Sequence, residues 1–201
     1  MGRSSNKIEI ASVNCITDAF DQSERLETFI PIGDKEPAWD GNIYIKHGDK
    51  SYSRIPAQVK GKSVKSLPKN PSYKVSLVNL ENYKRDGGIV YFVVFLLDDG
   101  TRAPYYRFLA PVDLKRYIQK AKGSSSTSIT LEPLGPVVGE LERLFIQFYY
   151  DCKRQTSFSS SDIMTLEEAI KNGYSLNYRI YGATSQEDAF KFMTNNYTMI
   201  R

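Results

Sequence analysis

Hydrophobic and polar positions alternate in two neighbouring stretches of the chain, residues 39–45 and 54–60. Such alternation predicts β-strands, because successive side chains of a strand point to opposite faces of a sheet. A polar turn at 47–50 separates the two stretches. The pattern therefore predicts a β-hairpin with one apolar face, directed into a core, and one polar face.

Three polar side chains of this hairpin are placed to meet. Gln58 and Lys60 are two residues apart on the second strand, so they share its polar face. Asp40 opens the first strand, and pairing of the two strands brings its carboxylate beside the amide and the amine. These three residues form a candidate catalytic site. The structural alternative is that Asp40 caps a turn with Gly41 while Gln58 and Lys60 belong to an ordinary solvent-exposed face.

Helical and strand patterns alternate through the rest of the first 120 or so residues. The run at 89–97 is β-branched and aromatic throughout, which predicts a strand buried on both faces at the centre of the sheet. Residues 61–72 are rich in lysine, proline and small polar residues, which predicts a mobile basic loop. The other predicted elements are helices at 5–20, 79–84 (with an asparagine cap) and 111–121, and strands at 26–32 and 105–109.

A serine-rich stretch at 123–128 predicts a domain boundary. An amphipathic helix is expected at 138–153, and its Leu and Phe stripe is either core or a docking surface for self-association or for a defence-complex partner. A further helix at 165–173, a strand at 175–181 and a helix from 185 are expected after it, and the chain could be the start of a longer protein. The predicted division is a domain at 1–122, a linker at 123–136 and a smaller α+β accessory segment at 137–201.

The pair formed by Asp40 and the Gln58-x-Lys60 motif resembles the PD-(D/E)xK nuclease superfamily, in which a strand acid precedes an acid-x-Lys on the next strand. The nearest subtype is D…QxK, found in Mrr-like nucleases and related nuclease domains of bacterial defence proteins. Trp39 stands where the superfamily name has proline, and Gln58 replaces an acid, which removes a negative charge from the site. The resemblance implies an α/β, restriction-endonuclease-like αβββαβ core with a central mixed sheet flanked by helices.

The resemblance also implies an activity, that of a metal-dependent endonuclease cleaving DNA with little sequence specificity as the effector of an anti-phage defence system. Asp40 would be the main ligand of Mg²⁺ or Mn²⁺, with Gln58 offering an amide oxygen. Glu9, on the N-terminal helix, would be a second acid, with Glu27 as its rival and a first-turn helical acid as the simpler reading of Glu9. Lys60 would orient or deprotonate the attacking water, or stabilise charge at phosphorus. A catalytically inactive nucleic-acid-binding module and a protein-interaction domain remain open alternatives.

Positive charge is concentrated around the second strand of the hairpin. The chain carries a net charge of +4, yet residues 46–85 hold ten Lys and Arg against two acids, so this window carries +8 and the remainder −4. A concentrated basic patch predicts a polyanionic ligand. We expect Lys62, Lys65 and Lys69 to contact the phosphates of DNA, with double-stranded DNA as the expected form.

Other signals exclude several classes of protein. No apolar run approaches the ~18 residues that a membrane span needs. The first seven residues lack the apolar region of a signal peptide. Cys15 and Cys152 are far apart in sequence and fit reduced thiols of a cytoplasmic protein. The single histidine, His47, lies in the hairpin turn, and no Cys/His spacing typical of zinc sites occurs.

Overall fold

The computed structural model describes residues 4–33, 38–48, 51–121, 123–156 and 166–173, together with Ser185 and Glu187. Contacts divide the chain into two units, Met1–Ser159 and Ser160–Arg201. In the second unit the described helix is α5 (Leu166–Lys171), which falls within the helix predicted at 165–173. The strand predicted at 175–181 lies outside the described residues, as does the helix predicted from 185, apart from Ser185 and Glu187.

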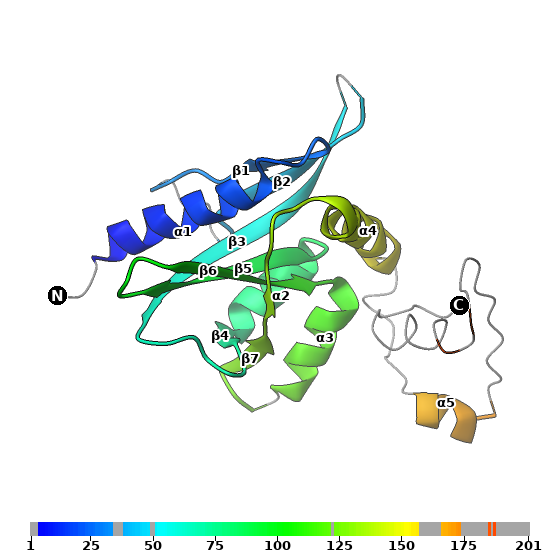
Figure 1. Ribbon diagram of the computed structural model, residues 1–201. Coiled ribbons are helices and arrows are strands. Elements are labelled where there is room, and N and C mark those ends of the chain that lie inside the picture. Colours follow the sequence, from blue (N-terminus) through cyan, green and yellow to red (C-terminus); the bar gives the residue numbers. More distant parts are fainter. Residues whose placement is uncertain are drawn as a thin grey trace. The chain divides into compact units, whose positions relative to one another are not determined.

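A six-stranded mixed sheet runs through the first unit (Figure 1). Its order is β1-β2-β3-β5-β6-β8, and neighbouring strands are antiparallel except for β3 and β5, which are parallel. A mostly antiparallel sheet flanked by helices confirms the predicted mixed α/β class. The strands are β1 (Leu26–Phe29), β2 (Gly41–Lys46), β3 (Tyr52–Val64), β5 (Ile89–Leu97), β6 (Arg102–Leu109) and β8 (Glu132–Pro133).

Strand β5 is the central strand, as its uninterrupted apolar sequence predicted. It pairs with β3 on one side and with β6 on the other. Its side chains alternate between two hydrophobic clusters, so that Phe92 belongs to one cluster while Tyr91 and Val93 belong to the other. A strand with a core on each face cannot tolerate polar positions, which explains its composition.

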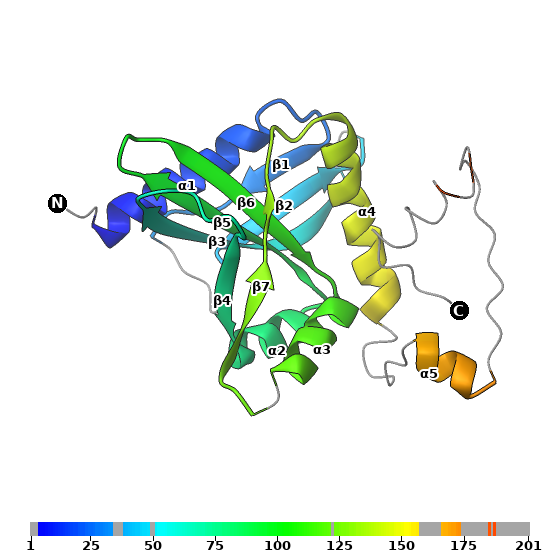
Figure 2. The same ribbon diagram turned by 60° about the horizontal axis from the view of Figure 1, so that its bottom comes forward.

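Helices cover both faces of this sheet (Figures 1 and 2). Helices α1 and α4 pack on one face, and α2, α3 and a two-stranded sheet of β4 and β7 pack on the other. None of the described helices is long and apolar enough to cross a membrane. The bounds are α1 (Ser5–Phe20), α2 (Leu77–Arg85), α3 (Pro111–Lys120), α4 (Gly139–Thr156), β4 (Ser72–Ser76) and β7 (Ser126–Thr130).

The structure divides the chain later than the serine-rich stretch predicted. Much of the expected linker 123–136 is strand, because β7 pairs with β4 and β8 pairs with β6. Ile129 of β7 is completely buried, so the serines and threonines around it are the exposed side of a strand. Helix α4 also belongs to the first unit, since Phe145 and Phe148 of its apolar stripe pack into the sheet core. The stripe at 138–153 therefore contributes to the core, which is the first of the two alternatives that the sequence left open.

Two local predictions are corrected near the hairpin. The basic segment expected as a loop from residue 61 first continues β3, with residues 61–64 paired to β5. Helix α2 begins at Leu77, two residues earlier than predicted. Its cap is Ser76, whose hydroxyl accepts from the backbone N–H of Asn79 at 3.2 Å. Serine is as favourable as asparagine at this position, and the observed cap lies about one helical turn before the predicted cap, Asn79.

Candidate active site

Strand β3 changes partner halfway along its 13 residues. Residues 52–57 pair with β2, and residues 57–64 pair with β5. Since β2 begins opposite Ala57, no described strand pairs with the β2-side edge of β3 beyond that point. Asp40 lies where this open edge begins, because its backbone N–H donates to the carbonyl of Ala57 at 2.9 Å. The fold therefore leaves room beside β3 at the position of the candidate site.

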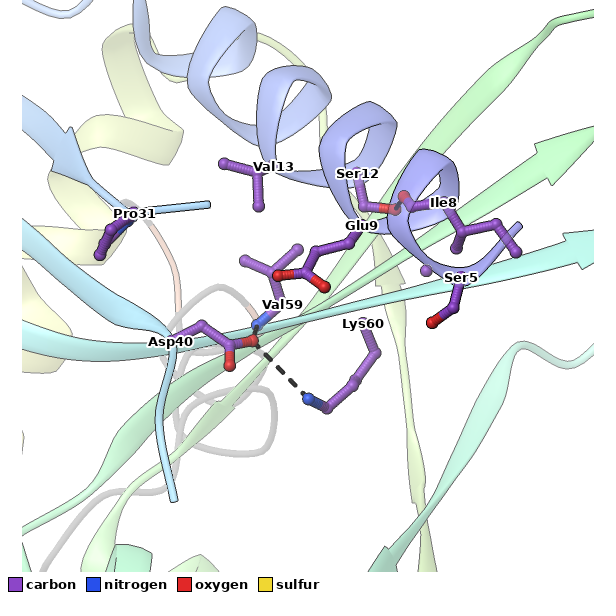
Figure 3. Close-up of a pocket in the computed structure, with 10 residues that line it drawn as sticks. Ser5, Ile8, Glu9, Ser12, Val13, Pro31, Asp40, Val59 and Lys60 are labelled. Carbon is purple, nitrogen blue, oxygen red and sulfur yellow. Dashed lines mark hydrogen bonds and ion pairs between the residues drawn. The ribbon is translucent and has the colours of Figure 1, made fainter. Parts of the chain in front are cut away.

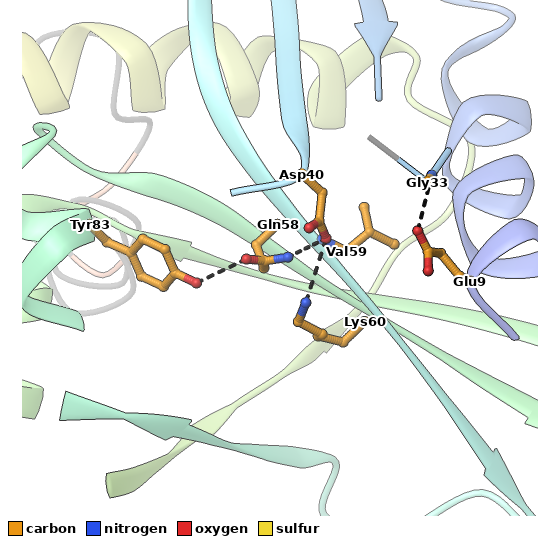
Figure 4. Close-up of polar contacts among 7 residues, drawn as sticks. All are labelled: Glu9, Gly33, Asp40, Gln58, Val59, Lys60 and Tyr83. Carbon is orange, nitrogen blue, oxygen red and sulfur yellow. Dashed lines mark hydrogen bonds and ion pairs between the residues drawn. The ribbon is translucent and has the colours of Figure 1, made fainter. Parts of the chain in front are cut away.

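One carboxylate oxygen of Asp40 is surrounded by donors. Its Oδ2 accepts from the backbone N–H of Val59 at 2.9 Å and from Nε2 of Gln58. The ammonium of Lys60 lies 3.7 Å from the same oxygen (Figure 4). The structure thus brings together the three residues that strand alternation singled out. Asp40 is fixed by backbone and side chains alike, which limits its freedom to reorient.

Gln58 is turned away from the role that the sequence suggested for it. It is buried, with 3% of its surface exposed, and its Oε1 accepts from the hydroxyl of Tyr83 at 3.1 Å. An ionised carboxylate can only accept, so the amide must turn its nitrogen to Asp40 and its oxygen to Tyr83. In this arrangement the amide oxygen, which was expected to face a metal, is used by a tyrosine instead.

Tyr83 is the site residue that sequence reasoning missed. It lies on α2, 25 residues after Gln58, and is 1% exposed. Burial, and to a smaller extent the charge of Asp40, raises the pKa of Tyr83 well above its ordinary value. The hydroxyl therefore stays protonated and can donate. No periodicity in the sequence connects the two residues, because Tyr83 reaches Gln58 only when the connection between the parallel strands β3 and β5, which contains α2, packs against the sheet.

A pocket of about 230 Å³ opens beside Asp40 and Lys60 (Figure 3). Its walls are the first half of α1, Pro31 and residues 59–61 of β3. Glu9 of α1 lines the same pocket, with its Oε1 accepting from the N–H of Gly33 at 3.3 Å. Figure 4 shows the Glu9 and Asp40 carboxylates on either side of Val59.

The rival acid, Glu27, lies elsewhere. It is on β1, where its carboxylate is 3.5 Å from the ammonium of Lys46, and it does not line the pocket. Its side chain is 59% exposed. Of the two acids considered from the sequence, the structure therefore brings Glu9 to the pocket of Asp40 and leaves Glu27 on β1, the edge strand of the sheet.

Gly61 allows α1 to approach β3 closely enough to form this wall. A Cβ at Gly61 would collide with the side chains of Ile8 and Ser12 and would lie 3.1 Å from the carbonyl oxygen of Ile8. Any larger residue would therefore force the helix away from the strand. Glu9 follows Ile8 directly, so the position of its carboxylate depends on this glycine.

The donor set fits one divalent cation better than two. The described residues contain no cluster of three or more His, Cys, Asp or Glu that could hold a metal. Asp40 and Glu9 are the acids of the pocket. Mg²⁺ is commonly bound by one or two carboxylates with water completing its coordination, so these two residues suit a single, largely hydrated ion.

The lysines expected to contact phosphates are exposed and lie beyond the pocket. Lys62 is on β3, two residues after Lys60, and Lys65 and Lys69 precede β4. None of the three lines the pocket itself. Their positions are compatible with contacts to a long polyanion that extends away from Asp40.

No protein-family model matches the chain, and no curated protein matches it either. Among solved structures, the nuclease D212 from a fusselovirus is similar at a TM-score of 0.41 and 13% sequence identity. The match covers 79% of this chain and 99% of that chain. A likeness at this level does not establish a common fold.

Proposed function

We propose that the chain is a metal-dependent nuclease that hydrolyses phosphodiester bonds in DNA. The observation that supports this is the pocket at the open edge of β3, where the Asp40 carboxylate and the Lys60 ammonium are 3.7 Å apart and Glu9 lines the same wall. An acid and a lysine on adjoining extended segments form the arrangement that the D…QxK resemblance implies.

In this proposal Asp40 and Glu9 hold one Mg²⁺ or Mn²⁺ ion. When bound, such an ion polarises the phosphate and acidifies a water. The Gln58 amide and the Val59 N–H hold Asp40 in one orientation, so little reorganisation is needed during the reaction. Lys60 is 38% exposed, so its ammonium can reach solvent and donate to the attacking water or to a phosphate oxygen.

The exposed lysines give the proposal two further properties. Lys62, Lys65 and Lys69 would contact phosphates, and such contacts position the nucleic acid without reading bases. We therefore propose little sequence specificity and a steep loss of binding with added salt. The setting in bacterial anti-phage defence is proposed from the sequence resemblance alone.

The test is cleavage of supercoiled plasmid DNA with Mg²⁺ or Mn²⁺ and with a chelator. We expect metal-dependent nicking that is lost in Asp40→Ala and in Lys60→Ala, while circular dichroism melting shows both variants folded. Asp98→Ala and Lys120→Ala, which change exposed residues away from the pocket, are the matched controls. If both site variants cut as fast as the wild type, the site assignment is wrong. If the wild type cuts with neither metal, the proposed function is wrong.

A catalytically inactive nucleic-acid-binding module is the second candidate. It is favoured by Gln58, which stands in place of an acid and whose oxygen is held by Tyr83 rather than directed at the pocket. This candidate predicts a salt-sensitive mobility shift of DNA without cleavage in either divalent metal. The same gel therefore separates the two functions.

A further inference from the structure

The two faces of the hairpin and its neighbour β1 differ in burial. The inner face is mostly core, because Leu26, Ile43, Ile45, Ile55 and Ala57 are at most 2% exposed, whereas Thr28 and Ser53 are partly buried. The side chains on the other face alternate with these. In β1, in β2 and in the first half of β3, every side chain on that face is partly or fully exposed. We call this surface the open face; it consists of Glu27, Phe29, Asn42, Tyr44, Lys46, Tyr52, Arg54 and Pro56.

Aromatic rings are prominent on the open face. Phe29 is 61% exposed and Tyr52 is 54% exposed, and the ring of Tyr44 meets that of Tyr52 edge to face with centroids 6.2 Å apart. An exposed group of aromatic side chains on one sheet face is a common mark of a binding surface. Their planar faces suit a flat, apolar ligand group such as a nucleobase.

Cationic groups stand between these rings. The strand register sets Arg54 opposite Tyr44 and Lys46 opposite Tyr52. Arg54 is exposed, and the side chain of Lys46 is 37% exposed although Glu27 lies 3.5 Å from its ammonium. Aromatic rings with interleaved cations are complementary to a chain that carries bases and phosphates together.

The open face is continuous with the candidate active site. Asp40 precedes Asn42 by two residues and Gln58 follows Pro56 by two, so the pair forms the next row of the same face. Lys46 is six residues from Asp40, a separation of about 20 Å along the strand. Gln58 in this row is buried against Tyr83, but Asp40 also lines the pocket, whose wall on the other side of the strand edge is α1. A ligand lying on the open face would therefore reach the pocket past the carboxylate of Asp40.

We propose that the open face binds a single-stranded segment of nucleic acid, with bases stacked on Phe29, Tyr44 and Tyr52, and delivers the strand to the pocket of Asp40 and Lys60. This inference rests on the proposed function and names its substrate class. The bases of an intact duplex are already stacked on one another, so their faces are not available to the sheet. Single strands, or ends and gaps in a duplex, are then preferred over the continuous double strand that the charge pattern suggested.

The experiment is fluorescence anisotropy of the full chain with labelled oligothymidylate, and with a duplex of the same length, in a chelator so that no cleavage occurs. We expect the single strand to bind more tightly. The double variant Phe29→Ala/Tyr52→Ala should lose roughly tenfold or more in affinity, given the size of base stacking on aromatic residues. Replacing both by leucine keeps apolar area without a stacking ring and should weaken binding similarly. Tyr150→Ala, at a tyrosine of α4 that is 43% exposed, is the matched control and should bind like the wild type.

The outcomes separate this inference from the proposed function. Tight single-strand binding that needs the aromatic residues, without cleavage when metal is added, would support the surface and remove the nuclease. Wild-type affinity in the alanine or leucine variant, or binding of duplex as tight as that of the single strand, would overturn the surface even in an active nuclease. A change from dimer to monomer by light scattering, with oligonucleotide binding unchanged, would also overturn it and identify the face as a self-association surface.

Discussion

Asp40 and Asp113 are both shielded from water, but their surroundings differ. Asp40 is 19% exposed at its side chain, faces a pocket and has a lysine ammonium within 3.7 Å. Asp113 is 6% exposed in the first turn of α3, where its carboxylate accepts from the N–H of Ala110 at 3.3 Å. Burial raises the pKa of Asp113 to about 6, although Ala110, Arg107 and Arg116 each act to lower it.

The difference shows why burial alone does not identify a functional acid. Asp113 works with Gln155 of α4, which accepts from the N–H of Val112 at 3.1 Å, to satisfy backbone donors at the start of α3. A strongly perturbed pKa is compatible with such a structural role. Asp40 differs in that its surroundings combine fixed donors with an open space where a ligand can bind.

The largest effect is expected when the same substitution is made at each acid. Asp40→Asn keeps the size of the side chain but removes the charge that would hold a cation and face Lys60. We expect cleavage to fall roughly 100-fold or more, the range typical for loss of a group that acts in the reaction. Asp113→Asn is the matched control and should cut like the wild type. Equal initial rates for the two variants would remove the distinction between the acids.

A smaller effect is expected from moving the helix that carries Glu9. In Gly61→Ala the new methyl group meets Ile8 and Ser12, so α1 must shift away from β3. Overpacking of this kind costs about 1–3 kcal/mol of stability, and displacement of Glu9 should also weaken metal activation of cleavage. The measurements are urea denaturation and the dependence of rate on metal concentration. Gly135→Ala, at a glycine whose added Cβ would have no neighbour within 4 Å, is the control.

Much of the scaffold on which this contrast rests could be predicted from local patterns. Helix α1 and strand β5 have the bounds that periodicity indicated, and alternation placed Asp40, Gln58 and Lys60 on one face. These features depend on local patterns of hydrophobic and polar residues, which is why they could be predicted from the sequence.

The features that were missed depend on tertiary packing. The bond between Tyr83 and Gln58 exists only because α2 packs across the sheet, and it determines which way the amide points. The requirement for Gly61 appears only once α1 lies against β3. Strand β7 shows no alternation of hydrophobic and polar residues, because Ile129 is its single buried residue and its other residues are serine and threonine. None of these relations leaves a periodic signal along the chain.

A smaller loss of cleavage than in Asp40→Asn is expected when the hydroxyl that holds Gln58 is removed. In Tyr83→Phe the buried Oε1 of Gln58 loses its donor, so the amide is free to rotate and Asp40 is less well oriented. We expect cleavage to fall about tenfold, as is typical when a group behind a metal ligand is removed. An unsatisfied buried acceptor should also cost about 1–3 kcal/mol of stability.

The control for Tyr83→Phe is Tyr91→Phe, which removes a hydroxyl from the same aromatic cluster without touching the bond to Gln58. The rate at saturating substrate should fall in the first variant alone, with the substrate concentration for half-maximal rate little changed. The side-chain amide resonances of Gln58 in NMR spectra should shift in Tyr83→Phe as well. Equal rates for the two variants would show that Tyr83 supports the fold and not the site.

No effect on cleavage is expected from Asp113→Asn. The difference in stability between this variant and the wild type should instead depend on pH. Because the pKa of Asp113 is raised from 3.8 to about 6 in the folded chain, the folded state holds its proton where the unfolded state has lost it. The contribution of this group to the stability of the wild type therefore falls as pH rises from about 4 to about 6 and stays low above that range.

Asparagine keeps an acceptor for the Ala110 N–H but carries no charge, so the variant should be more stable than the wild type at neutral pH by up to about 3 kcal/mol. In urea denaturation this advantage should shrink toward zero as pH approaches 4, and a constant difference across the range would mean that Asp113 is not the group that titrates.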